Sequence, residues 1–175
     1  LEQGRMLRGW ALAMQGEAVA GAADIRQGLA ASQGVGPETL RPHWLALLAE
    51  AYSAAGQPEA GLTVLDEAFT LVATREARWW EAELSRLKGV LLLQLPSPEV
   101  SQAEACFQQA LEVARRQQAK ALELRAALSL ARLWQGQGKR AAACQLLAEI
   151  YGWFTEGFDT ADLQEAKALL QELGA

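Results

Sequence analysis

Small residues recur along this chain at a nearly constant interval, and a large apolar residue follows each of them at a fixed distance. Two series are visible, one spaced by 40, 40 and 42 residues and the other by 40, 42 and 40. The first series is Gly9, Ala49, Gly89 and Ala131, and the second is Gly21, Gly61, Ala103 and Ala143. Two helices approach each other closely only where a small residue lies at the contact. Because one helix pair cannot bury its apolar face alone, the pattern predicts a stack of helix pairs.

Glycine and proline residues mark the ends of the predicted helices. Gly16 and Gly56 are predicted to end the first helix of the first two units, because glycine tolerates a positive φ. Pro58 and Pro98 are predicted to stand in the first turn of a second helix, where no backbone N–H is needed. The segment 34–37 (GVGP) is predicted to separate the first two units.

The predicted architecture is all-α, since strand-forming runs of Val, Ile and Thr are almost absent. The repeat units of a single domain are expected at about 1–34, 35–74, 75–118 and 119–157, and Gly157 is expected to end the last paired helix. The two extra residues of the third unit fall at 95–98, in a loop. A final amphipathic helix at 159–173 is expected to cap the stack. Because the chain starts at Leu1 within a helical pattern, we expect it to be a piece of a longer polypeptide.

Charge and hydropathy argue against several classes of partner. The net charge is -5, and 16 basic residues are scattered among 21 acidic ones, whereas a nucleic-acid surface needs clustered Lys and Arg. The longest uncharged apolar stretch, at 90–95, is far too short to span a membrane. Neither nucleic acid nor a membrane is therefore expected as a partner. Cys106 and Cys144 lie in alanine-rich helical contexts, so buried thiols are expected rather than a disulfide, which favours a cytoplasmic location.

The sequence carries no pattern that predicts catalysis, a cofactor or a metal. His43 is the only histidine and has no cysteine nearby, so it is expected to be a surface or groove residue rather than a metal ligand. Without a histidine, a serine or cysteine nucleophile has no obvious base. The segment 136–140 (GQGKR) lacks the spacing of a phosphate-binding loop and is expected to be a turn between helices.

The offsets within each unit resemble those of the tetratricopeptide repeat (TPR). The second unit carries the pattern best, with Leu48-Ala49-Glu50-Ala51-Tyr52 followed by Gly56, Gly61, Leu65 and Ala68. The period of this chain exceeds the family's usual period of about 34 residues, which indicates longer helices and linkers. The resemblance implies a right-handed α-solenoid of antiparallel helix pairs whose concave groove binds a protein or peptide.

A closer resemblance is to the C-terminal repeat region of large bacterial signalling proteins. These proteins join an adenylate/guanylate cyclase or DNA-binding domain to a STAND-type ATPase and a helical repeat tail. The segments that carry the resemblance are 78–89 (RWWEAELSRLKG), 103–118 (AEACFQQALEVARRQQ) and 151–170 (YGWFTEGFDTADLQEAKALL). The resemblance implies a sensor or scaffold arm that is not itself an enzyme.

The TPR resemblance also places a set of residues on the concave face. At the register of the small residues they are Trp10, Met14, His43, Glu50, Glu83, Arg86, Arg125 and Arg132. This surface is apolar at one end and basic at the other, so an acidic peptide, or an acidic face of the parent protein, is one expected ligand. The alternative is that Glu83, Arg86 and Arg125 simply pair with one another.

The tryptophans outside that set are expected to pack inside the fold. Trp80 and Trp134 are expected in the core, and Trp153 and Phe154 against the final helix. Trp10 is expected either to contact a ligand or to seat a preceding helix. The leading functional hypothesis is a protein-interaction arm, and the alternatives are a small-molecule effector sensor and a structural or self-association module.

Overall fold

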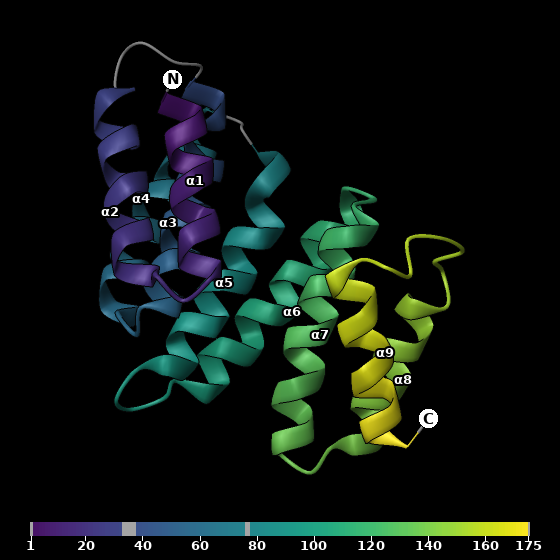
Figure 1. Ribbon diagram of the computed structural model, residues 1–175. Helices are drawn as coiled ribbons and strands as arrows, with labels where there is room; N and C mark the ends of the chain where they lie inside the picture. Colours follow the sequence, from purple (N-terminus) through teal and green to yellow (C-terminus); the bar gives the residue numbers. More distant parts are fainter. Residues whose placement is uncertain (1, 33–37, 76–77, 175) are drawn as a thin grey trace.

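The computed structural model describes residues 2–32, 38–75 and 78–174, and these contain helices and loops but no strand (Figure 1). The predicted linker at 34–37 and Leu1 lie outside the described residues. The elements are α1 (Glu2–Met14), α2 (Ala18–Ala31), η1 (Glu38–Leu40), α3 (Arg41–Ala54), α4 (Pro58–Arg75), η2 (Arg78–Trp80), α5 (Glu81–Gln94), α6 (Val100–Arg116), α7 (Lys120–Gly136), α8 (Arg140–Tyr151) and α9 (Ala161–Leu173).

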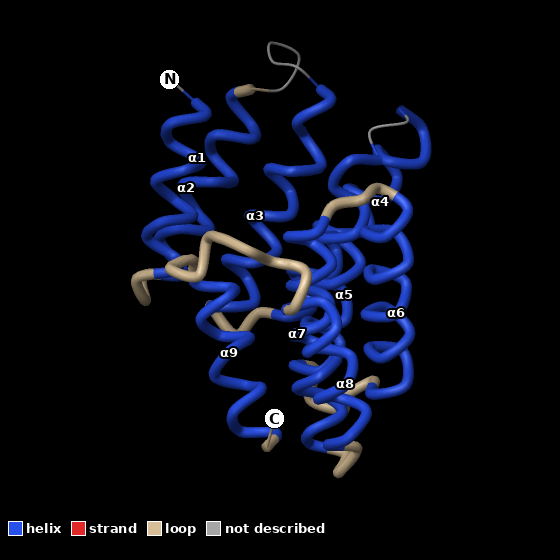
Figure 2. Tube along the Cα trace, turned by 90° about the vertical axis from the view of Figure 1, so that its right-hand side faces the viewer, coloured by secondary structure: helices blue, strands red, loops and turns tan. Residues whose placement is uncertain are grey.

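The helices pack as successive pairs in two layers. Each odd-numbered helix from α1 to α7 packs against the helix that follows it, and each odd-numbered helix also contacts the next odd-numbered one, up to α9. The two ends of the chain lie at opposite ends of this stack, with α1 at one end and α9 at the other (Figures 1 and 2). α9 packs on α8 and α7, so it takes the place that the first helix of a fifth pair would have.

The small residues lie where paired helices cross. A Cβ added at Gly21 would meet the carbonyl oxygen of Gly9 and would lie 2.8 Å from the backbone nitrogen of Ala13. A Cβ added at Gly89 would lie 2.5 Å from Cε1 of Phe107, which is the large residue predicted to fill that space. The interlocking of small and large residues that the repeat predicts is therefore how α1 meets α2 and how α5 meets α6.

The large apolar residues of the repeat form the core. One large apolar residue lies four positions after each small residue of the second series, and all four of these residues are at most 1% exposed. They are Ile25, Leu65, Phe107 and Leu147. They divide between two buried clusters, one built on α1–α5 and the other on α5–α9, so α5 belongs to both. A shared helix joins the two halves of the core into one stack.

Gly16 and Gly56 have φ values of +97° and +66° in the turns after α1 and α3, as predicted. Two other helix boundaries differ from the prediction. α6 begins at Val100, so Pro98 lies before its first turn and not within it. α8 ends at Tyr151 and not at Gly157, because Gly152 already interrupts the helix with a residue of low helix propensity. Gly157 lies in the following loop with a φ of +76°.

The cysteines and the tryptophans outside the predicted groove are less buried than expected. Cys106 and Cys144 are free thiols, as predicted, but both are half-buried, and burial raises the pKa of the Cys106 thiol. Trp80 and Trp134 pack half-buried on the edge of the core. Trp153 is 59% exposed and does not pack as predicted on the final helix, because α8 ends before it. Instead, Lys120 lies over its ring.

Candidate functional site

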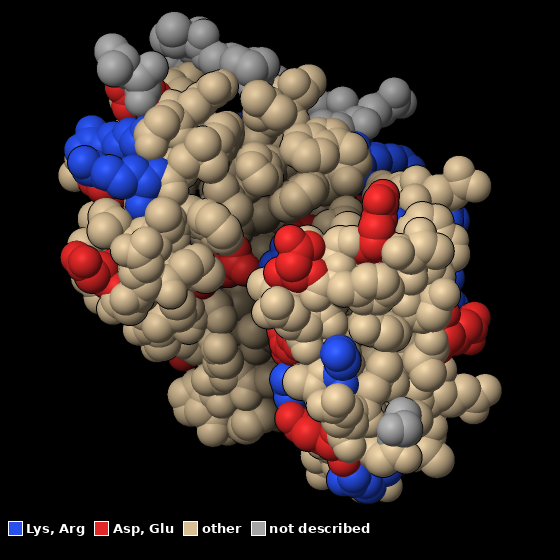
Figure 3. All heavy atoms as spheres, turned by 45° about the vertical axis from the view of Figure 1, so that its right-hand side comes forward, with Lys and Arg blue, Asp and Glu red and all other residues tan. Residues whose placement is uncertain are grey.

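The odd-numbered helices line a concave surface that contains three adjoining hollows. Figure 3 shows the cleft that they form between the N-terminal helices and α7 and α9. The lining residues of α3 are His43, Ala46, Leu47 and Glu50, at the spacing i, i+3, i+4 and i+7. The corresponding positions of α7 are Arg125, Leu128, Ser129 and Arg132. Residues at this spacing share one helical face, so one stripe of each helix faces the cleft.

The first hollow, which we call the tryptophan hollow, has a volume of about 240 Å³ between α1, α3 and α5. Apolar side chains dominate its walls, and Trp10 and Trp80 flank it together with His43. The Nδ1 atom of His43 and the Nε1 atom of Trp80 are buried without a hydrogen-bond partner among the described residues. Burial also lowers the pKa of His43. The remaining lining residues are Leu7, Ala46, Leu47, Glu50, Glu83, Leu87 and Arg125.

A network of ion pairs forms the floor between the first and the second hollow. Arg86 donates hydrogen bonds of 2.7 and 3.0 Å to the carboxylate of Glu83, which is only 3% exposed. Arg125 lies 3.1 Å from Glu83 and 3.3 Å from Glu50. Burial would lower the pKa of Arg86, but Glu83, Glu50 and Asp162 outweigh this effect and raise the pKa above its ordinary value. The network therefore fixes both arginines in place.

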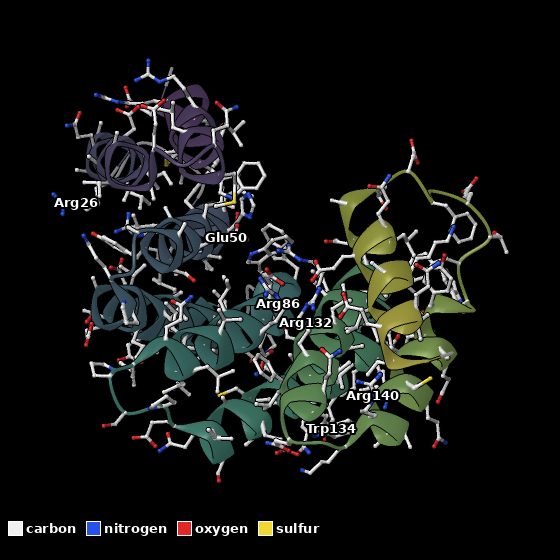
Figure 4. All side chains as sticks on the ribbon, turned by 60° about the horizontal axis from the view of Figure 1, so that its bottom comes forward. Arg26, Glu50, Arg86, Arg132, Trp134 and Arg140 are labelled. Carbon is white, nitrogen blue, oxygen red and sulfur yellow. The ribbon has the colours of Figure 1, made fainter. Side chains whose placement is uncertain are left out.

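The second hollow, which we call the ionic hollow, has a volume of about 250 Å³ and connects α7 with α9. Its walls are mostly polar, and Arg132 donates a 2.9 Å hydrogen bond to Glu165 of α9. Figure 4 shows Glu50, Arg86 and Arg132 around the same opening. Asp162 also lines the hollow, and its carboxylate has no hydrogen bond or ion pair with any other described residue. The full lining is Glu50, Arg86, Arg125, Leu128, Ser129, Arg132, Asp162 and Glu165.

The third hollow, which we call the apolar hollow, is the largest, with a volume of about 590 Å³ between α5, α6 and α7. Phe107 of α6 lies at its base, and Val100, which is 39% exposed, lies at its rim. It shares Ser129 and Arg132 with the ionic hollow, and the ionic hollow shares Glu50 and Arg125 with the tryptophan hollow. The three hollows therefore form one continuous groove. The other lining residues of the apolar hollow are Val90, Leu93, Gln94, Leu133, Gly136 and Gln137.

Seven of the eight residues placed on the concave face from the sequence line the first two hollows. They are Trp10, His43, Glu50, Glu83, Arg86, Arg125 and Arg132. Met14 is the exception, because it lies at the end of α1, 45% exposed, and lines none of the three hollows. Whether these residues bind a partner stays a prediction.

Part of the groove was not predicted from the sequence. Val90 follows Gly89 as Trp10 follows Gly9 and as Glu50 follows Ala49, so the repeat register itself could have identified it. Asp162 and Glu165 come from α9, which was expected only to cap the stack. No repeat register leads to them, because α9 has no second helix to complete a unit.

The predicted basic end of the groove is not basic. Glu83, Arg86 and Arg125 pair with one another, which was the alternative left open by the sequence, and Arg132 pairs with Glu165. An acidic ligand would have to displace carboxylates that already hold these guanidinium groups. The acidic peptide expected from the sequence therefore does not suit this groove.

The described residues contain no group of three or more His, Cys, Asp and Glu side chains that could hold a metal ion. Residues 137–139 form the turn between α7 and α8, with Gly138 at a φ of +78°, as expected for the glycine-rich segment. None of the helices in the described ranges is long and apolar enough to cross a membrane.

Solved structures of TPR-like repeats have the same fold. Two crystal structures of nearly identical TPR-like repeats, from a kinesin-light-chain-like protein of Podosopora anserina, match the chain with TM-scores of 0.70 and 0.69. Each is 16% identical, and each match covers 98% of this chain and 84% of the other. No protein-family model matches the chain, and no curated protein does. The likeness establishes the fold, and the predicted TPR-like α-solenoid is confirmed.

Proposed function

We propose that this chain is a protein-interaction module that holds an extended segment of a partner protein along its concave groove. The observation that carries the proposal is the continuity of the three hollows. They share lining residues and lie along α1, α3, α5, α7 and α9. Exposed apolar side chains stand near both ends, Leu7 at 50% exposure and Val100 at 39%. Apolar pockets with a few fixed polar groups are the usual form of a recognition site.

We also propose a biological setting for the module. The segments 78–89, 103–118 and 151–170 support a regulatory or scaffold arm of a bacterial signalling protein, acting in the cytoplasm on a partner or on other domains of its own polypeptide. In this proposal the module has no enzymatic role, and any cyclase or ATPase activity belongs to other domains. Sequencing the complete reading frame tests the setting, because a frame that encodes neither a cyclase nor an ATPase would contradict it.

Selection from a random displayed heptapeptide library tests the binding function. A Cβ added at Gly136, in the wall of the apolar hollow, meets no atom within 4 Å, so the backbone accepts a side chain there and Gly136→Trp is expected to fill part of the hollow. The expected result is that selected peptides bind this variant at least about tenfold more weakly than the original chain. Gly4→Trp in α1 is the matched control, since its Cβ also meets nothing within 4 Å and it lies outside the groove. Peptides that bind both variants equally would contradict the proposal.

The size of the apolar hollow favours a second candidate, a site for a small effector molecule. Its volume of about 590 Å³ lies within the range typical of ligand pockets. A thermal-shift screen with metabolites separates the two functions, because a bound effector raises the melting temperature by an amount that grows with the logarithm of its concentration relative to Kd. The Gly136→Trp variant should lose that shift, and Gly4→Trp should keep it.

A further inference from the structure

We propose that the groove selects a segment in which a basic residue stands between two apolar residues. The basic side chain enters the ionic hollow beside Asp162, and the apolar side chains enter the tryptophan hollow and the apolar hollow. This inference rests on the proposed peptide-binding function and adds the chemical class of the ligand. The order of the hollows along the groove, apolar, ionic and apolar, defines the order of the residues in the ligand.

Charge balance favours a cation in the ionic hollow. Four carboxylates line it or form its floor, those of Glu50, Glu83, Asp162 and Glu165, against the three guanidinium groups of Arg86, Arg125 and Arg132. One negative charge is therefore left over. The whole chain has a net charge of -5, so the long-range field also attracts basic segments and repels acidic ones.

The ion pairs around the ionic hollow show which of its carboxylates has no arginine partner. Arg86 is held by Glu83, Arg125 by Glu83 and Glu50, and Arg132 by Glu165. Asp162, in the first turn of α9, is the lining carboxylate without a partner among the described residues. A lysine or arginine of the ligand can pair with Asp162 without breaking any of these interactions.

The pKa of Arg86 agrees with this assignment. Its side chain is only 12% exposed, and burial by itself would lower the pKa. The carboxylates of Glu83, Glu50 and Asp162 nevertheless raise the pKa above its ordinary value, so the charges around the ionic hollow favour the cationic form.

Helix α5 limits the spacing between the two apolar residues of the ligand. Glu83 and Leu87 line the tryptophan hollow, and Val90 and Leu93 line the apolar hollow. At a rise of about 1.5 Å per residue, the two pairs of positions lie about 5–15 Å apart along the helix axis. An extended peptide advances about 3.3 Å per residue, so its apolar residues should be about two to five positions apart, with the basic residue between them.

Three synthetic peptides test the charge at the centre. They have the sequence Ser-Leu-Ser-Xaa-Ser-Leu-Ser with Lys, Gln or Glu at Xaa, and each is titrated by fluorescence anisotropy at low and at high salt. The expected order of affinity is Lys, then Gln, then Glu, with about a tenfold or greater preference for Lys over Glu at low salt that shrinks at high salt. Equal affinities, a preference for Glu, or no binding by any of the three would overturn the inference.

Two variants of the chain assign the preference to one carboxylate. Asp162→Asn should reduce the Lys-over-Glu ratio by about fivefold or more. Asp159→Asn, which removes the same charge from an exposed residue that lines none of the three hollows, should leave the ratio unchanged. If Asp162→Asn has no effect, the inference is wrong. Heptapeptides selected from the random library that depend on the groove but lack a central basic residue would also contradict it, while leaving the proposed binding function intact.

Discussion

The indole N–H of Trp10 donates a hydrogen bond of 2.6 Å to the carboxylate of Glu50, 40 residues along the chain. The two residues occupy the same register position in α1 and α3, each directly after a small residue of the repeat. Glu50 also pairs with Arg125 of α7, 75 residues further on. One carboxylate therefore connects three helices of the concave layer at the wall of the groove.

Replacing Trp10 with Phe should weaken the contact between α1 and α3. The variant keeps an aromatic ring but leaves one oxygen of Glu50 without its donor, and a hydrogen bond to a charged group is worth about 1.5–3 kcal/mol. We expect a loss of about 1.5 kcal/mol in the free energy of unfolding, measured by urea denaturation. In a Glu50→Gln background the same substitution should cost less, and equal costs in the two backgrounds would contradict the coupling.

Adding a methyl group at Gly21 should destabilise the first helix pair. The new Cβ would meet the backbone of Gly9 and Ala13, and backbone atoms cannot move aside as a flexible side chain can. Overpacking of this kind costs about 1–3 kcal/mol, so the melting temperature of Gly21→Ala should fall. Gly4→Ala in α1 is the control, and it should raise stability slightly because its Cβ meets nothing within 4 Å and alanine favours helix. Equal effects of the two substitutions would mean that α1 and α2 do not pack as closely as described.

Removing the carboxylate of Glu83 should cost more than removing the whole ion pair. Glu83→Leu leaves Arg86 with only 12% of its side chain exposed and without its main partner, and breaking a buried pair in this way costs about 3–5 kcal/mol. The double variant Glu83→Leu/Arg86→Met leaves no uncompensated guanidinium at that point and should recover most of this loss. Equilibrium unfolding of the two proteins checks the order, and a double variant less stable than the single one would contradict it.

The free energy of unfolding should depend on pH just below neutrality, because His43 is protonated more readily in the unfolded chain than in the folded one. Burial lowers the pKa of His43 below its ordinary value of 6.5, and its Nδ1 atom has no hydrogen-bond partner among the described residues. Below about pH 6.5 the unfolded chain therefore binds a proton that the folded chain does not, and stability falls as the pH falls, by at most about 1.4 kcal/mol per pH unit. Above that pH the effect is absent.

The variant His43→Phe isolates this effect. Phenylalanine keeps an aromatic ring against Trp80, whose ring centroid lies 4.8 Å from that of His43, but it cannot be protonated. Urea unfolding at about pH 7.5 and about pH 5.5 should show a larger loss for the original chain than for the variant. Asp24, Glu104 and Glu123, whose pKa values are lowered, titrate below this window. Parallel pH profiles would show that His43 can be protonated in the folded state.

The repeat register predicts much of the groove but not its chemistry. The TPR resemblance, applied at the register of the small residues, placed Glu50 and Arg132 on one face, and the same register points to Val90. Trp153 and Met14 show where the register fails, since both lie at helix ends, where small differences in length decide which way a side chain points. Helix ends depend on local capping and glycine placement, which vary from unit to unit.

The sequence by itself determined that the chain forms helix pairs and which residues lie between them. Small and large residues at a fixed period describe contacts between neighbouring helices, and such contacts depend only on positions a few turns apart. Only the tertiary structure decided the charge of the groove. The partners of its arginines come from α3, α5 and α9, and Glu50 and Arg125 are 75 residues apart in the chain. Ion pairs form wherever oppositely charged side chains meet in the folded chain. The end of the groove that the sequence predicts to be basic is therefore acidic in the structure, because Asp162 and Glu165 of α9 lie in its wall.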